Sequence, residues 1–226
     1  MTDGQVIALL VVAIIAGAAG VGWINSRNRL RRAEFIRTFR LPPGLLGKVS
    51  ERYPHLELKD AALVSRGLRQ FFIAYLMNGK RFVSMPSQVA DELWHEFILY
   101  TREYQDFCDK AFGSFLHHTP AAVLSSDRKR NEGLRRVWWY CCKYENIHPV
   151  NPTRLPLLFA LDAKLKILSG HVYYLTRDGK GERPWATEHY VGDFSSTSFD
   201  GGTDGLGDGG GNGGGGGDGG GCGGGD

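Results

Sequence analysis

The chain has 226 residues, a net charge of +3 at neutral pH, and 42% hydrophobic residues. Without an apolar N-terminal segment and a glycine-rich C-terminal one, about 160 residues remain, enough for one domain with a hydrophobic core. This middle part is near neutral, so the basic surface of a nucleic-acid-binding protein is not supported. Four cysteines without a CxxC pair argue against a disulfide framework and favour a reducing compartment.

Residues 6–24 are predicted to form a transmembrane helix. The 19 residues carry no charge, and as a helix they reach roughly 28 Å, close to the hydrocarbon thickness of a bilayer. A cleaved signal peptide is the alternative, but residues 1–5 contain Asp3 and no basic residue. Six arginines follow the span: Arg27, Arg29, Arg31, Arg32, Arg37 and Arg40. The positive-inside rule therefore predicts a single-pass inner-membrane protein with its N-terminus outside and its C-terminal domain in the cytoplasm.

The basic segment 25–41 is predicted to be a juxtamembrane helix. Its arginines mark the topology, and they also attract anionic lipid headgroups. Within the span, small residues recur four apart, as at Ala13 and Gly17. Such spacing lets two helices approach closely, so a homodimer through the span is one hypothesis.

Residues 42–194 are predicted to fold as an all-α helical bundle. No βαβ rhythm is present, although residues 171–176 (HVYYLT) are compatible with one strand. Apolar periodicity and capping residues predict helices over about 43–53, 60–77, 87–111, 127–144 and 153–168.

The last segment, 195–226, is predicted to be a disordered Gly/Asp-rich tail. Between Gly201 and Asp226, 18 of 26 residues are glycine, so the segment cannot bury enough apolar surface to become ordered. A calcium-binding β-roll is the alternative, but it needs an aliphatic residue in each turn, and only Leu206 is available.

Asp91 and His95 lie four residues apart in the predicted helix 87–111, so their side chains share one face. An Asp–His pair orients an imidazole for metal binding or acid–base chemistry, or it stabilises the helix. As a metal site it needs a third ligand from another element. The histidines available for this are His55, His148, His117 and His118.

Cys108 belongs to a second hypothetical site. In a straight helix, His95 and Cys108 are about 20 Å apart, and no helix-breaking residue separates them, so they cannot bind one ion. Cys108 with His117 or His118 after the helix end is the remaining arrangement. The alternative is that Cys108 is a packed thiol, as expected also for Cys141 and Cys142.

Trp94 and Phe97, on the apolar side of the same helix, are expected in the core. Residues 89–120 resemble glycine-rich domain-containing protein-like sequences, which have Asp-x-x-Trp-His followed by Cys, Phe-Gly and His-His-x-Pro. The positions that carry the resemblance are Asp91, Trp94, His95, Thr101, Tyr104, Cys108, Gly113, His117, His118 and Pro120. Phe97 stands where relatives often have a second histidine, which argues against a His-x-His metal site, and the resemblance implies no established reaction.

The sequence thus favours a membrane-anchored protein-binding or scaffolding module that binds a protein partner. The alternative is a metal-binding or enzymatic domain that uses Asp91, His95, Cys108, His117 and His118, distributed over more than one site, with a divalent metal such as zinc. The lack of a phosphate-binding loop, a dinucleotide fingerprint, an HExxH helix and a nucleophile elbow argues against an enzyme. The sequence leaves enzymatic activity open.

Overall fold

The computed structural model describes residues 3–118, 127–179 and 185–195. The predicted tail lies outside the described residues except for Ser195. Along the chain the elements are α1 (Asp3–Thr38), α2 (Leu45–Arg52), α3 (Leu58–Met77), α4 (Gln88–Leu99), α5 (Thr101–Ala111), α6 (Asp127–Tyr144), α7 (Leu157–Lys164), β1 (His171–Tyr174), η2 (Arg177–Gly179), β2 (Thr187–Tyr190) and α8 (Gly192–Ser195).

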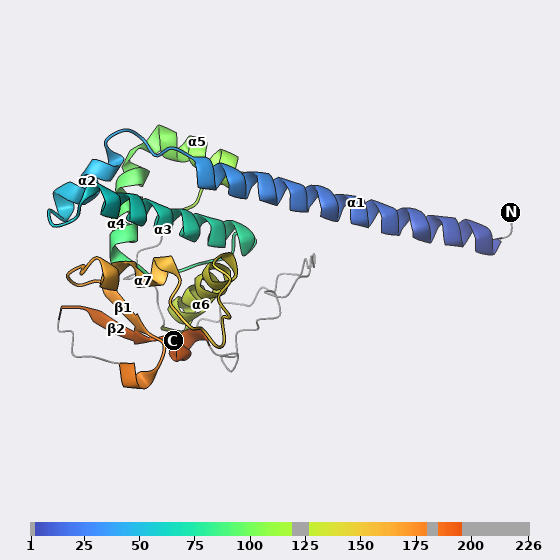
Figure 1. Ribbon diagram of the computed structural model, residues 1–226. Helices are drawn as coiled ribbons and strands as arrows, with labels where there is room; N and C mark the ends of the chain where they lie inside the picture. Colours follow the sequence, from blue (N-terminus) through green and yellow to red (C-terminus); the bar gives the residue numbers. More distant parts are fainter. Residues whose placement is uncertain (1–2, 119–126, 180–184, 196–226) are drawn as a thin grey trace, which may run out of the picture.

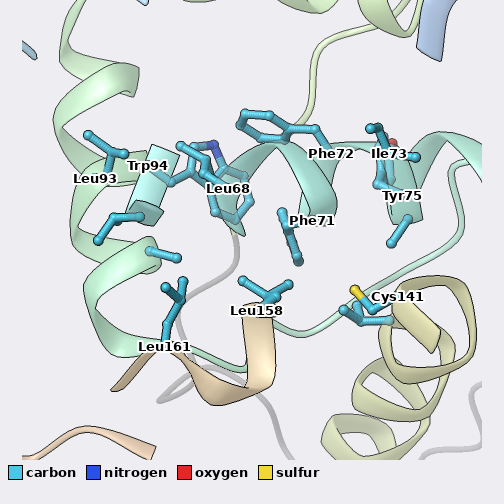
Figure 2. Packing of buried hydrophobic residues seen from close by; sticks show 14 of the residues in the cluster. Leu68, Phe71, Phe72, Ile73, Tyr75, Leu93, Trp94, Cys141, Leu158 and Leu161 are labelled. Atoms are coloured by element: carbon cyan, nitrogen blue, oxygen red, sulfur yellow. The ribbon is translucent and has the colours of Figure 1, made fainter. Parts of the chain in front are cut away.

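Helix α3 lies at the centre of the domain (Figure 1). Twelve of its 20 residues are buried, and it packs against α1, α2, α4, α6 and α7. Figure 2 shows Leu68 and Phe71 of this helix between the side chains of α4 and α7. At Gly67, a Cβ would lie only 2.4 Å from Leu161 of α7. A glycine here therefore lets the two helices approach closely.

The described residues form a mostly helical fold, as predicted, together with a small sheet that was not. Strands β1 and β2 pair in parallel, with His171 opposite Thr187. The first strand matches the HVYYLT segment. The second, TEHY, lacks an alternating apolar pattern and has one exposed and three half-buried residues, so its sequence carries little signal. The all-α prediction is corrected to this extent.

The predicted helix 87–111 is broken at Tyr100, contrary to the expectation of a continuous helix. Tyr100 has φ −80° and ψ 66°, outside the helical region. In a straight helix Phe107 would lie about 15 Å along the axis from Phe97. In the structure their ring centroids are 5.4 Å apart. Neither proline nor glycine causes the break, and burial of both aromatic rings in one core accounts for it.

Helix α1 combines a membrane-type segment with a part of the domain. Its apolar N-terminal part projects away from the other elements (Figure 1). It contains an 18-residue window of mean hydropathy 2.5, none of it buried, which is long and apolar enough to cross a membrane. Near its C-terminal end, Ala33 and Ile36 are fully buried where α1 packs against α3 and α5. The predicted segment 6–24 and most of the predicted segment 25–41 thus form one helix, which ends at Thr38, and the core begins before residue 42.

The buried carboxylate of Asp162, at the end of α7, joins three elements. It accepts hydrogen bonds from Ser87 Oγ and the Gln88 amide at 2.7 Å each, and from the amides of Val89 at 3.3 Å and His171 at 2.8 Å. Burial raises the pKa of Asp162, and these donors partly offset that effect. The carboxylate satisfies amides at the start of α4, where the helix dipole favours a negative charge.

Replacing Asp162 by Asn should therefore destabilise the domain. The amide group would keep the shape but turn an N–H donor toward existing donors, which leaves buried groups unpaired. We expect the free energy of unfolding to fall by roughly 2–3 kcal/mol, measured by urea unfolding of the detergent-solubilised chain. Asp178→Asn, at an exposed position, is the control and should change little. Equal stability of the two variants would contradict a structural role for this carboxylate.

The core position of Phe97 gives a second prediction, since both Phe97 and Trp94 are buried as expected. Phe97→Ala should cost about 3–5 kcal/mol, because it removes a large aromatic ring from a packed core. Leu99→Ala, two residues along the same helix at a position that is 71% exposed, should change stability by less than about 0.5 kcal/mol. A loss below about 1 kcal/mol for Phe97→Ala would mean that this face is not core.

Candidate metal centre

Asp91, His95 and His118 converge on one point, and all their ligand atoms lie within 4.8 Å of one another. His118 Nε2 is 3.0 Å from Asp91 Oδ1 and 3.1 Å from His95 Nε2. The remaining pair, His95 Nε2 and Asp91 Oδ2, is 3.7 Å apart. Metal–ligand bonds of 2.0–2.2 Å place neighbouring ligands roughly 3–3.5 Å from each other. The three groups therefore have the composition and spacing of a divalent-metal site.

Two of these ligands come from α4 in the way that the sequence predicts. Ser87 caps the helix by accepting a hydrogen bond from the Ala90 amide at 3.3 Å. Asp91 follows in the first turn, and His95 lies one turn later on the same face. The start of α4 is held by Asp162, so both ligands stand on a helix whose position is set by buried hydrogen bonds.

The third ligand, His118, arrives on the segment that follows α5. The helix break at Tyr100 makes this return possible. The His118 ring packs edge-on against Trp94, with centroids 4.7 Å apart. Trp94 Nε1 donates to the Tyr104 hydroxyl at 3.0 Å, and that hydroxyl donates to the Leu116 carbonyl at 2.6 Å. Two buried side chains thereby fix the backbone two residues before His118.

Arg32 of α1 and Lys80 hold the start of this segment. Arg32 of α1 donates a hydrogen bond to the Phe112 carbonyl at the end of α5, and Lys80 Nζ donates to the same carbonyl at 3.3 Å. Cations at a helix C-terminus are electrostatically favourable. Gly113 follows with φ +71°, and a Cβ there would lie 2.8 Å from Arg32. Arg32, expected to be only a topology signal or a lipid contact, therefore also supports the segment that carries His118.

Asp91 and His118 line a pocket of about 290 Å³, whereas His95 is not among the residues that line it. Asp91 and His118 are largely covered, with exposed side-chain fractions of 22% and 14%, whereas His95 is 46% exposed. The pocket is also lined by Lys80, Ser84, Ser87 and His171. Three protein ligands beside an open space are typical of a catalytic or substrate-binding metal site, because a structural zinc site is closed by a fourth protein ligand.

The other residues considered from the sequence lie outside this group of three, although His117 also lines the pocket. Cys108 is fully buried beside Tyr104 and the Leu116 backbone, and burial raises the pKa of its thiol. His117 is exposed, with its ring 4.8 Å from that of Phe115. Among the described residues, neither joins a group of three or more potential metal ligands.

The remaining histidines that were considered as third ligands have other contacts. His55 Nε2 lies 3.0 Å from the Leu165 carbonyl, and His148 Nδ1 accepts hydrogen bonds from the amides of Val150 and Asn151. Cys141 and Cys142 are buried in α6, as expected for packed thiols, and burial raises the pKa of both.

Sequence reasoning missed Lys80 and His171 as residues of the pocket. Lys80 follows the Asn-Gly turn that ends α3 and has φ +62°, and nothing in its sequence context distinguishes it from a surface lysine. His171 opens β1, and its place beside α4 depends on the bond from its amide to Asp162. The strand that carries His171 and helix α4 are about 80 residues apart in the chain, so their proximity leaves no local signal in the sequence.

Comparison with known proteins adds a family but no activity. Neither the curated proteins nor the solved structures contain a match to this chain. One family model, described as UCP032817-like, matches residues 31–194. The match includes the whole Asp91–His118 region and begins inside α1, just before the buried Ala33. It does not support the glycine-rich domain name suggested by the motif. The chain belongs to the UCP032817-like family.

Proposed function

We propose that this protein is a membrane-anchored metal-binding domain in which Asp91, His95 and His118 hold a divalent ion such as zinc. The supporting observation is the convergence of two imidazole nitrogens and one carboxylate within 4.8 Å, at the edge of a pocket. Zinc is bound by such ligands in hydrolytic enzymes, where it activates water. The expected protein partner stays a prediction, since no described contact bears on it.

The anchor forms the second part of the proposal. Helix α1 would cross the membrane through residues 6–24, with the arginines of residues 27–40 on the cytoplasmic side. The exposure of its apolar side chains supports a lipid environment, because burial of these side chains needs a partner that the domain does not supply. Since Arg32, Ala33 and Ile36 belong to the fold, metal experiments require the whole chain and not a fragment that starts at residue 41.

Removal of His118 should abolish tight metal binding. The full-length chain in detergent, treated with a chelator, should take up about one cobalt or zinc ion per chain. His118→Ala should weaken binding by at least about 100-fold, more than the loss of an outer-shell group. His117→Ala changes the neighbouring exposed histidine and is the matched control. It should leave the affinity unchanged, and thermal melting without metal should show that both variants are folded.

The cobalt spectrum separates this site from a cysteine site. Ligation by Asp91, His95 and His118 predicts visible ligand-field bands without the near-ultraviolet thiolate charge-transfer band that Cys108 would produce. A thiolate band, or an unchanged affinity in His118→Ala, would contradict the proposed ligand set. Absence of binding for zinc, cobalt and manganese alike would contradict the metal proposal altogether.

Topology gives an independent prediction. With the arginines on the cytoplasmic side, protease added to intact spheroplasts should leave the domain uncut, and it should cut the domain once detergent has opened the membrane. A periplasmic marker protein digested in the first step is the control for protease access. Digestion of the domain in intact spheroplasts would reverse the orientation, whereas release of a soluble, shortened chain would identify a cleaved signal peptide.

A further inference from the structure

The pocket beside the proposed metal centre is small, and a bound metal ion would give it a positive charge. Its volume of about 290 Å³ lies at the lower end of the range for small-molecule sites. Of the described residues that line it, Asp91 is the acidic one, and it is a proposed metal ligand. A divalent ion bound by one carboxylate and two neutral imidazoles keeps a net positive charge. The pocket should therefore favour an anion.

Lys80 supplies a second cation at this pocket. Lys80 lines the pocket, and its Nζ donates a hydrogen bond to the Phe112 carbonyl at 3.3 Å. An ammonium carries three N–H donors, and this bond uses one of them. The metal and Lys80 thus offer two positive centres to one ligand. A phosphate group suits such a pair, because it carries up to two negative charges and has several acceptor oxygens.

The position of Arg32 along α1 brings this pocket near the predicted membrane span. Arg32 shares the Phe112 carbonyl with Lys80 and follows Ile24, the predicted end of the span, by eight residues. This corresponds to about 12 Å along the helix axis. The headgroup layer reaches roughly 5–8 Å beyond the hydrocarbon core. The intervening Arg27, Arg29 and Arg31 are exposed and would draw anionic groups toward this region.

We infer that the pocket binds a phosphate group between the metal of the Asp91–His95–His118 site and the ammonium of Lys80. This inference rests on the proposed metal site. The phosphate has two sources with the same chemistry, the headgroup of an anionic lipid or a soluble phosphate compound, and the nearby membrane makes the first accessible to the pocket.

The test uses the cobalt-loaded full-length chain in detergent with inorganic phosphate as the probe. Phosphate should shift the visible cobalt bands in a saturable manner. Lys80→Gln should weaken this response about tenfold, the effect of losing one charge-assisted hydrogen bond, and Lys80→Arg should largely preserve it. Lys110→Gln is the matched control, because Lys110 is exposed near the end of α5 and does not line the pocket.

Cobalt affinity without phosphate is measured first for every variant, so that failure of the metal site is recognised separately. Normal cobalt binding with no spectral response to phosphate would overturn the inference and leave the metal proposal intact. If Lys80→Gln lowered the affinities for cobalt and phosphate equally, Lys80 would act by holding the Phe112 carbonyl in place and not by binding phosphate. That result would also overturn the inference.

Nanodiscs distinguish the two sources. The cobalt-loaded chain is placed in phosphatidylcholine alone or with added phosphatidic acid, whose headgroup is a phosphate monoester. A cobalt shift with phosphatidic acid that is weakened by Lys80→Gln would support the inference and identify a lipid headgroup as the source. A shift with inorganic phosphate but none with phosphatidic acid would support the inference with a soluble phosphate compound as the ligand.

Discussion

The position of the candidate site depends on the hydrogen bonds that the buried carboxylate of Asp162 accepts. This carboxylate joins α7 to the first turn of α4 and to the start of β1 through four hydrogen bonds. A charge buried among apolar helices is tolerated only with such donors. Because Asp91 and His95 lie within the first two turns of α4, the same bonds orient the two proposed metal ligands relative to the core. His171 is brought to the pocket by the same carboxylate.

The third proposed ligand, His118, depends on different contacts, which extend to α1. Arg32 holds the segment after α5 at Phe112, and Tyr104 holds it again at Leu116. His118 follows two residues later, with its ring against Trp94. A movement of α1 relative to the domain would therefore displace the backbone that carries a proposed ligand. The C-terminal end of α1, with Ala33 and Ile36, is part of the domain core.

Much of the site was predictable, since its elements depend on local patterns. The four-residue spacing of Asp91 and His95, the Ser87 cap and the apolar face with Trp94 and Phe97 are all properties of one helix. His118 was among four histidines considered as the third ligand, and spacing could not choose among them. Helix α6 begins and ends as predicted, α7 is shorter, and β2 was missed because its four residues show no alternation.

The sequence by itself determined the order of the helices, the apolar character of α1, the buried face of α4 and which potential metal ligands the motif contains. These follow from periodicity, capping and composition, which act over a few residues. Only the tertiary structure decided that the long helix breaks at Tyr100, that His118 and not His55 or His148 joins Asp91 and His95, and that Arg32 and Lys80 share the Phe112 carbonyl. Each of these depends on burying aromatic side chains and pairing polar groups between segments distant in the chain, and such contacts leave no mark in the local pattern of either segment.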